Sequence, residues 1–271
     1  MNPENPDSAY FAVRPEFQRL ALLVGEASMA AMEQKQVIVI GLGGVGSWAA
    51  EALVRSGIGR ITIVDNDVIS PSNINRQIEA LPATVGLPKA TALARRLHEI
   101  NPRCKVSAFN QIFSGETASL LGIDKADYVI DAIDSMPHKL DLIEIVIEKT
   151  TLFSSMGMAQ KLDPTRIKTA DIWSTRNCPI ARLVRQGLRK RGFTGNFTVV
   201  YSDEQHKRQK EIQYESGGPT TPEWSDGKKI INGSLVTVTA TAGMILASLV
   251  IRDIMNKANN SIAGAGFISR G

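Results

Sequence analysis

The sequence predicts an α/β fold with a mostly parallel sheet and helices on both faces. Short apolar runs of strand length alternate along the chain with helix-compatible stretches. The first of these runs leads directly into a glycine-rich turn and then into a helix-compatible stretch. This order favours a parallel sheet whose ligands bind where the strands end and the loops begin.

Each predicted element follows from hydrophobic periodicity. The apolar runs predicted as strands are residues 36–40, 60–64, 105–110, 128–133 and 151–155. The stretches predicted as helices between them are residues 47–56, 88–100 and 138–149.

We expect one compact unit with two regions. Residues 1–159 would form an N-terminal helix and a nucleotide-binding Rossmann-like region, and residues 160–271 a smaller substrate or crossover region that returns to the core. The second region contains a basic helix at 179–191 and a polar, Gly- and Pro-rich stretch at 215–227 that predicts a mobile loop. The tail after Lys257 is rich in Asn, Ser, Ala and Gly and is expected to fray.

One apolar stretch, residues 230–251, carries no formal charge and is long enough to be considered as a membrane span. Its Thr/Val alternation at 236–241 predicts a buried strand that leads into a core helix at 243–256. Residues 1–20 lack the basic start and apolar run of a secretory signal. We therefore expect a cytoplasmic protein, with peripheral membrane contact left open.

Composition excludes two classes of small-domain site. The two cysteines, Cys104 and Cys178, lie too far apart in sequence for a paired CxxC zinc site and are too few for a disulfide framework. The formal net charge of +4 is compatible with an anionic partner but decides nothing alone.

The glycine-rich turn predicts a nucleotide site. The segment Gly41-Leu-Gly43-Gly44-Val-Gly46 follows a strand and opens a helix, and glycines allow the backbone and the helix N-terminus to approach a phosphate closely. Asp65 ends the next strand, where a carboxylate can accept hydrogen bonds from ribose hydroxyls. These features do not separate ATP from NAD, because dehydrogenases use the same turn.

Residues after Asp65 favour ATP. Asn73, Arg76, Gln77 and Lys89 supply amide and cationic donors near the strand ends. Departing pyrophosphate carries growing negative charge that fixed cations stabilise. The alternative is that Arg76 and Lys89 are surface charges.

Two carboxylates, Asp131 and Asp134, end the fourth predicted strand. Mg²⁺ favours one or two carboxylates together with nucleotide phosphates. Asp134, just past the strand, is the predicted metal ligand, and Asp131 is the second choice. The alternative for Asp134 is a helix N-cap.

Together these motifs resemble the adenylating family that includes ubiquitin-activating enzymes and the molybdopterin and thiamine sulfur-carrier activators. The blocks that carry the resemblance occur in the family's order and spacing: Gly41-Leu-Gly-Gly-Val-Gly-Ser47, Asp65-Asn-Asp67, Ser72-Asn-Ile-Asn-Arg-Gln77, Gly86-Leu-Pro-Lys89 and Asp131-Ala-Ile-Asp134. The resemblance implies ATP, magnesium and a homodimer with two active sites.

The resemblance also assigns roles. Arg19 falls where an arginine of the family reaches the partner subunit's ATP. The resemblance places catalysis on Arg19, Arg76, Lys89 and Asp134, with Asp134 as metal ligand. It places the nucleotide on Gly41, Gly43, Gly44, Gly46, Asp65, Asp67, Asn73, Arg76, Gln77, Lys89 and Asp134.

Within this family, the chain is most similar to members that act on tRNA. The similarity extends through the Met156-Gly-Met segment, Leu162-Asp-Pro-Thr and a basic Pro-Ile-Ala-Arg-Leu-Val-Arg segment. Such members use ATP to activate the side-chain carboxylate of threonylcarbamoyladenosine beside the anticodon and then close a ring with loss of water. Some cooperate with a cysteine desulfurase and its sulfur acceptor, and some associate with membranes.

Contact with tRNA is predicted for the basic helix, because Lys and Arg contacts to phosphate position nucleic acid. The residues are Arg182, Arg185, Arg189, Lys190 and Arg191, supplemented by the basic run at 206–210. The alternative is a solvated amphipathic helix.

The chain also departs from some relatives. It lacks the paired CxxC motif of sulfur-carrier activators and a cysteine in the late apolar segment, which leaves Cys178 as the thiol of the crossover region, and for it a structural role is favoured. Two other functions stay open: activation of the C-terminus of a ubiquitin-like sulfur carrier, and nucleotide binding without catalysis.

Overall fold

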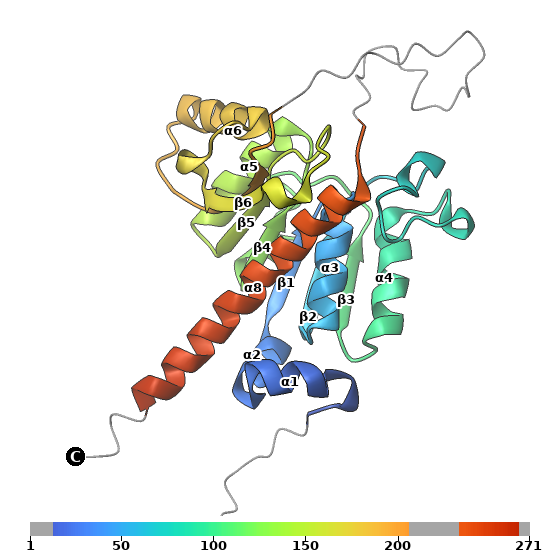
Figure 1. Ribbon diagram of the computed structural model, residues 1–271, viewed down its shortest axis with the longest axis vertical. Helices are drawn as coiled ribbons and strands as arrows, with labels where there is room; N and C mark the ends of the chain where they lie inside the picture. The colour runs from blue at the N-terminus through green and yellow to red at the C-terminus, as the bar shows by residue number, and fades with distance from the viewer. Residues whose placement is uncertain (1–12, 206–232, 266–271) are drawn as a thin grey trace, which may run out of the picture.

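A seven-stranded sheet forms the centre of the computed structural model, which describes residues 13–205 and 233–265, the last five of these without their side chains. The strand order is β3-β2-β1-β4-β5-β7-β6, and all neighbours are parallel except β6 and β7 (Figure 1). The strands are β1 (Gln36–Ile40), β2 (Arg60–Val64), β3 (Lys105–Phe109), β4 (Tyr128–Asp131), β5 (Thr151–Ser155), β6 (Ile167–Asp171) and β7 (Thr198–Ser202).

The helices alternate with the first five strands as predicted. They are α1 (Gln18–Val24), α2 (Glu26–Gln34), α3 (Gly46–Arg55), α4 (Lys89–Ile100), α5 (Met136–Ile147), α6 (Pro179–Lys190) and α8 (Val236–Ala265). Short 3-10 helices lie at Pro15–Phe17, Pro71–Asn73, Pro82–Thr84, Ile123–Lys125, Pro164–Arg166 and Ile172–Ser174. The predicted mostly parallel, helix-covered sheet is confirmed. Strands β3 and β4 end one and two residues earlier than predicted.

Two apolar cores lie on opposite faces of the sheet. In β1, Val37 and Val39 belong to the core shared with α2, α3, α4 and α8, whereas Ile38 and Ile40 belong to the core shared with α5 and α6. Successive strand side chains point to opposite faces. The uninterrupted apolar run of β1 therefore reflects a strand that is buried on both sides.

The prediction for residues 236–256 is wrong in its first half. Residues 236–241 are not a strand but the start of α8, which runs without a break to Ala265, past the predicted helix end at 256. The buried side chains follow a helical period: Val238, Ala242, Leu246, Ala247, Val250 and Ile254. The threonine hydroxyls on this helix donate to carbonyls one turn earlier, as from Thr241 to Thr237 at 2.6 Å. Alternation and helical period both fit this sequence, and packing against α3 and α2 selects the helix.

Among the described residues, α8 is also the helix that is long and apolar enough to cross a membrane by length and composition. The mean hydropathy of its best window is 1.6, and 44% of that window is buried inside the protein. Helix α8 packs lengthwise over α3 (Figure 1), as the core helix of a soluble protein also does. Length and composition are therefore weak evidence for a membrane span.

The chain order places a topological switch point between β1 and β4. From β1 the chain moves outward through β2 and β3, and then returns to β4 on the other side of β1. The connections that follow β1 and β4 therefore lead to opposite sides of β1, and such a switch point is where open α/β sheets bind ligands. The predicted glycine turn follows β1, and Asp134 follows β4.

Candidate functional site

The glycine turn after β1 is too tightly packed for side chains at two positions. Gly41 has φ +88°, and a Cβ there would lie 2.6 Å from the Ala132 carbonyl oxygen. A Cβ on Gly46 would lie 1.8 Å from the Gly41 carbonyl oxygen. Gly43 is more open, since its nearest neighbour would be the Gln77 Nε2 at 3.9 Å. The turn is thus held compact while Gly43 leaves its backbone approachable in front of the α3 N-terminus, as a phosphate cradle requires.

Asp65 fixes the shape of this turn. Its carboxylate accepts hydrogen bonds from the backbone N–H groups of Leu42, at 2.6 Å, and Asp67, at 2.8 Å. Burial raises the pKa of Asp65 above its ordinary value, while the Lys89 cation opposes the shift. Carboxylate oxygens carry further lone pairs, so a ribose hydroxyl could still be accepted.

Lys89 is a buried cation rather than a surface charge. Its residue is 5% exposed, and its Nζ donates to the Asp67 carboxylate at 2.8 Å. Its backbone N–H donates to the Asp67 carbonyl at 3.0 Å, which joins the start of α4 to the segment after β2. The structure therefore brings Asp65, Asp67 and Lys89 together at the carboxyl end of β2.

Asn73 and Gln77 are buried and face different partners. The Asn73 side chain accepts a hydrogen bond from the Ser70 N–H at 3.0 Å and so caps a 3-10 turn. The Gln77 amide nitrogen faces Gly43, and its Oε1 has no hydrogen-bond partner among the described residues. A buried amide oxygen without a partner beside an open glycine is a candidate ligand contact.

Arg76 is half-buried across the glycine turn. A Cβ on Gly44 would lie 3.1 Å from the Arg76 Cγ, so the arginine stem packs on this glycine. The guanidinium donates to the Ser72 carbonyl at 2.8 Å and to the Asn75 side chain at 2.9 Å. The Trp48 indole N–H, from α3, donates to the Arg76 carbonyl at 2.9 Å. These contacts anchor the arginine beside the glycine turn.

The two carboxylates after β4 have opposite environments. Asp131 is fully buried and paired with Lys139 at 2.7 Å, whereas Asp134 is exposed. This pairing excludes Asp131 as the metal ligand. Ser135, not Asp134, is the N-cap residue of α5, so the capping alternative for Asp134 is wrong as well.

The donor set fits a nucleotide-bound magnesium ion. The described residues contain no group of three or more His, Cys, Asp or Glu side chains that could hold a metal on their own. Magnesium that binds with a nucleotide takes one or two carboxylates, and phosphates and waters complete its shell. The exposed Asp134, on the loop that packs against Gly41, meets that requirement.

Glu79 is a charged residue of this region that the sequence prediction missed. It is 2% exposed, and neither carboxylate oxygen has a hydrogen-bond partner among the described residues. Burial raises the pKa of Glu79 to about 7, and the Lys89 cation opposes the rise. Glu79 follows Gln77, a predicted nucleotide-binding residue, by two positions, and this proximity in sequence could have identified it.

Arg19 lies at the other end of the sheet. Phe17, just before α1, packs near Gly57 after the C-terminal end of α3, and α2 leads directly into the first residue of β1. Helix α1 therefore sits at the amino edge of the strands, whereas the glycine turn is at their carboxyl edge (Figure 1). The exposed Arg19 is not brought together with the other predicted residues within one chain.

The five predicted tRNA-contacting cations, four on α6 and Arg191 just after it, differ in their environments. Arg185 donates to the Thr175 hydroxyl and Arg191 donates to Asp141 and Glu144, both at 2.7 Å, so these two have partners within the protein. Arg189 lies 5.3 Å from the Trp173 ring centroid. Arg182 and Lys190 are exposed. The basic run at 206–210 and the predicted loop at 215–227 lie outside the described residues.

Helix α6 nevertheless borders the carboxyl edge of the sheet. A Cβ on Gly157, in the loop after β5, would lie 2.6 Å from the Ile180 side chain in the first turn of α6. Cys178, just before this helix, is buried, as its predicted structural role requires.

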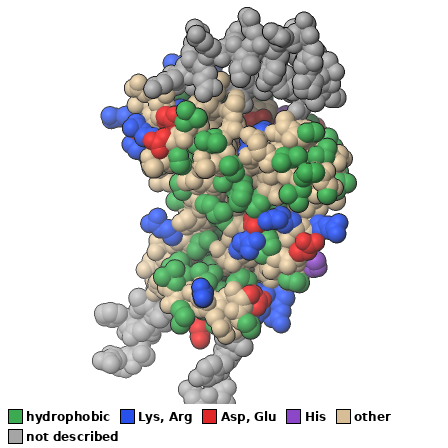
Figure 2. Space-filling model, turned by 45° about the vertical axis from the view of Figure 1, so that its right-hand side comes forward, with side chains coloured by type: hydrophobic (Ala, Val, Ile, Leu, Met, Phe, Trp, Pro, Cys, Tyr) green, Lys and Arg blue, Asp and Glu red, His purple; other side chains and the backbone are tan. Residues whose placement is uncertain are grey.

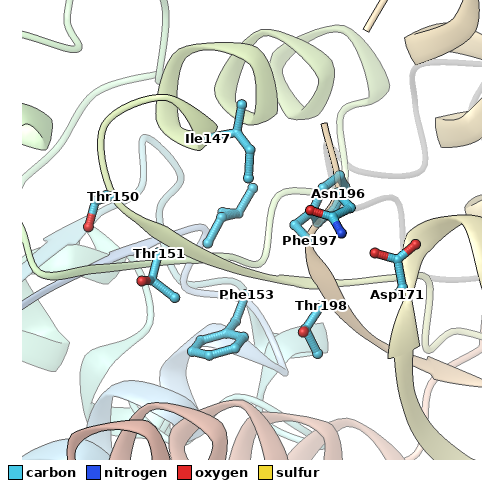
Figure 3. A pocket seen from close by; sticks show the side chains of 9 residues that line it. Ile147, Thr150, Thr151, Phe153, Asp171, Asn196, Phe197 and Thr198 are labelled. Carbon is cyan, nitrogen blue, oxygen red and sulfur yellow. The ribbon is translucent and has the colours of Figure 1, made fainter. Parts of the chain in front are cut away.

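A separate cavity of about 310 Å³ lies at the opposite edge of the sheet. Thr151 and Thr198, the first residues of β5 and β7, line it together with Ile147 at the end of α5 (Figure 3). Because the glycine turn and Asp134 follow strand ends, this cavity is distinct from the candidate nucleotide site.

Comparisons with known proteins agree with this geometry. The ThiF family profile matches residues 17–268. The chain is 38% identical over 242 residues to the tRNA threonylcarbamoyladenosine dehydratase of Bacillus subtilis (strain 168), with coverage of 89% of this chain and 94% of the relative. It is 34% identical to the Escherichia coli (strain K12) protein of the same name, over 91% and 96% of the two chains.

A solved structure of that Escherichia coli enzyme in complex with ATP superposes with a TM-score of 0.77 at 33% identity. It is matched over 90% of this chain and 96% of the other. A second structure, in complex with AMP, gives a TM-score of 0.78 at 35% identity over the same shares.

Proposed function

Because this chain belongs to the ThiF family, we propose that it uses ATP to adenylate the side-chain carboxylate of threonylcarbamoyladenosine in tRNA and then cyclises the product. The carrying observation is the set of groups at the carboxyl ends of β1, β2 and β4: a glycine turn that is open at Gly43, the buried Lys89 and the exposed Asp134. The relatives with ATP and AMP complexes support the same reaction class.

The first step would be attack of the carboxylate oxygen on the α-phosphorus of ATP. The bond from that phosphorus to the β-phosphate bridging oxygen breaks, and pyrophosphate leaves. A carboxylate is ionised at neutral pH, so this step needs no general base. Lys89 and Arg76 would stabilise the charge that grows on the leaving group, and the glycine turn would hold the phosphates. Asp134 would hold a magnesium ion, which would neutralise further phosphate charge when bound.

The second step would release AMP. The carbamoyl group of the same modified nucleoside attacks the activated acyl carbon and closes a ring, and the acyl–phosphate bond breaks. The oxygen that the carboxylate loses leaves on AMP, so the net change in the nucleoside is loss of water.

Docking of tRNA is proposed for the exposed part of α6. Arg182 and Lys190 point from the surface, and Arg189 is exposed beside Trp173. Phosphate contacts of this kind fix position without reading sequence. Arg185 and Arg191 contribute less, because their guanidinium groups are already engaged by acceptors within the chain.

A homodimer is proposed because the site lacks Arg19 from its own chain. Large apolar side chains are exposed along the segment that follows β2: Val68, Ile74, Leu81, Val85 and Leu87. Figure 2 brings this side forward, and green apolar side chains gather on it. An exposed apolar patch of this kind is typical of a protein interface. In such a dimer Arg19 would complete the partner's site.

Other expectations rest on the resemblance. They are peripheral membrane contact and cooperation with a cysteine desulfurase and its sulfur acceptor. A cytoplasmic location stays an expectation from the sequence.

Release of AMP in the presence of modified tRNA is the decisive experiment. We expect AMP formation from ATP only with tRNA that carries threonylcarbamoyladenosine, and a hundredfold or greater loss, roughly, in Arg76→Ala. Unmodified tRNA is the control. Pyrophosphate exchange that depends on a ubiquitin-like carrier would instead indicate a carrier activator, and ATP binding without exchange would indicate a module without catalysis.

A further inference from the structure

A buried ion pair lies at the base of the loop that carries Asp134, the proposed metal ligand. The Lys139 Nζ donates to the Asp131 carboxylate at 2.7 Å, and the two side chains are 2% and 0% exposed. The same carboxylate oxygen accepts from the Ser154 hydroxyl at 2.6 Å, and the same ammonium donates to the Ser155 carbonyl at 3.0 Å. The pair therefore joins the carboxyl ends of β4 and β5 to the first turn of α5.

This pair closes the base of one loop. Asp131 is the last residue of β4 and Lys139 lies in the first turn of α5, so the four residues between β4 and α5 are bracketed by the two charges. The other Asp131 oxygen accepts from the Ile133 N–H at 3.0 Å, inside the loop. The Lys139 N–H donates to the Ser135 carbonyl at 2.9 Å. Asp134 stands on this loop.

The same loop is packed against the phosphate cradle. The Ala132 N–H donates to the Ile40 carbonyl at 2.8 Å, and the Ala132 carbonyl lies where a side chain on Gly41 would be. Any shift of the loop therefore changes the position of Asp134 relative to the glycine turn.

Stability is a poor explanation for such a pair. Buried ion pairs are expensive to desolvate, and apolar replacements of similar volume are often as stable or more stable. A functional site needs supporting residues that packing and hydrogen bonds hold in place, and this pair has both.

We propose that Lys139 is a positioning residue for adenylation: paired with Asp131, it locks the loop after β4 so that Asp134 faces the glycine turn. This inference rests on the proposed function. The Lys139 side chain is buried and engaged with Asp131, so it would act through the loop rather than by direct contact with nucleotide or metal.

The test measures ATP affinity by calorimetry, once with EDTA and once with Mg²⁺, for each variant. The ratio of the two dissociation constants is the metal enhancement. In Asp134→Ala the enhancement should fall to nearly one, which tests the metal assignment itself. In Lys139→Met it should fall at least about fivefold, because a shift of an ångström in a site is costly, while affinity in EDTA stays unchanged. Lys139→Arg keeps the cation and should retain most of the enhancement.

Two further variants separate positioning from folding. Lys149→Met makes the same change at an exposed lysine just past the far end of α5 and should behave as the parent protein. Lys139→Met leaves a buried charge on Asp131 and is expected to melt at a lower temperature. The double variant Asp131→Asn with Lys139→Met is neutral and should regain thermal stability without regaining the enhancement.

Three results are decisive. A folded Lys139→Met protein with full enhancement overturns the inference, and so does recovery of the enhancement in the double variant. If Lys139→Met does not fold, the double variant decides. Unchanged enhancement in Asp134→Ala contradicts the proposed metal ligand instead, whichever result the Lys139 variants give.

Discussion

Lys89 donates to Asp67 across the carboxyl end of β2 at 2.8 Å, and the two side chains differ sharply in exposure, at 7% for the lysine and 60% for the aspartate. The Lys89 side chain is therefore buried, and its ammonium group is bound by a carboxylate that lies at the surface. An incoming phosphate would find a cation that is already oriented, which is how preorganised charges lower a barrier.

Replacement of this cation should slow the chemistry. We expect Lys89→Met to lower tRNA-dependent AMP formation by about a hundredfold, because charge on departing pyrophosphate would lose its stabilising partner. Lys105→Met, the same change at an exposed lysine at the start of β3, is the control. Single-turnover AMP release measures both, and equal rates would remove Lys89 from the catalytic set.

Arg19 should act across a dimer interface. We expect Arg19→Ala and Asp134→Ala to be inactive alone and to recover AMP formation when mixed, because a mixed dimer contains one site with both residues intact. The measurement is activity after co-refolding or co-expression of the two variants. Activity in Arg19→Ala alone, or no recovery on mixing, contradicts a role in the partner subunit.

The exposed cations of α6 should control tRNA affinity. Reversal of two charges in Arg182→Glu with Lys190→Glu should weaken tRNA binding and reduce the slope of log affinity against log salt by about two, if both contact phosphate. ATP affinity should stay unchanged. Filter binding across a salt series measures this. The control reverses the exposed Arg95 and Arg103 on and after α4; an equal loss there would indicate a general charge effect.

Glu79 should make stability fall as the pH rises. Its folded pKa of about 7 is above the ordinary 4.5, so between these values the folded protein keeps a proton that the unfolded chain has lost. By linkage, the contribution of Glu79 to stability is greatest below pH 4.5 and is lost as the pH rises to about 7. This difference between the folded and unfolded pKa values corresponds to about 3 kcal/mol in the free energy of unfolding.

Glu79→Gln removes this titration. We expect the variant to be more stable than the parent at pH 8, by up to about 3 kcal/mol, and equally stable near pH 4.5. Urea unfolding at the two pH values measures the free energies, with exposed Glu99→Gln as the control. A difference that does not change with pH would mean that folding does not raise the pKa of Glu79.

The sequence alone determined the elements whose signals are local. Residues 36–40 and 60–64 are apolar runs that end at a glycine turn and at an aspartate, and both became strands at those bounds. The glycine turn that begins at Gly41 was predicted from its place between a strand and a helix. Motif order was sufficient to gather Asp65, Asp67 and Lys89 into one prediction.

Only the tertiary structure decided the rest. The Thr/Val pattern at 236–241 is compatible with a strand and with a helix, and burial against α3 selected the helix. Asp131 and Asp134 are three residues apart and alike in sequence, yet Lys139 and Ser154 neutralise and bury the first. A charged side chain can bind a ligand only if it is not already buried and paired within the protein. Burial and pairing depend on residues distant in the chain, because both are set by tertiary packing.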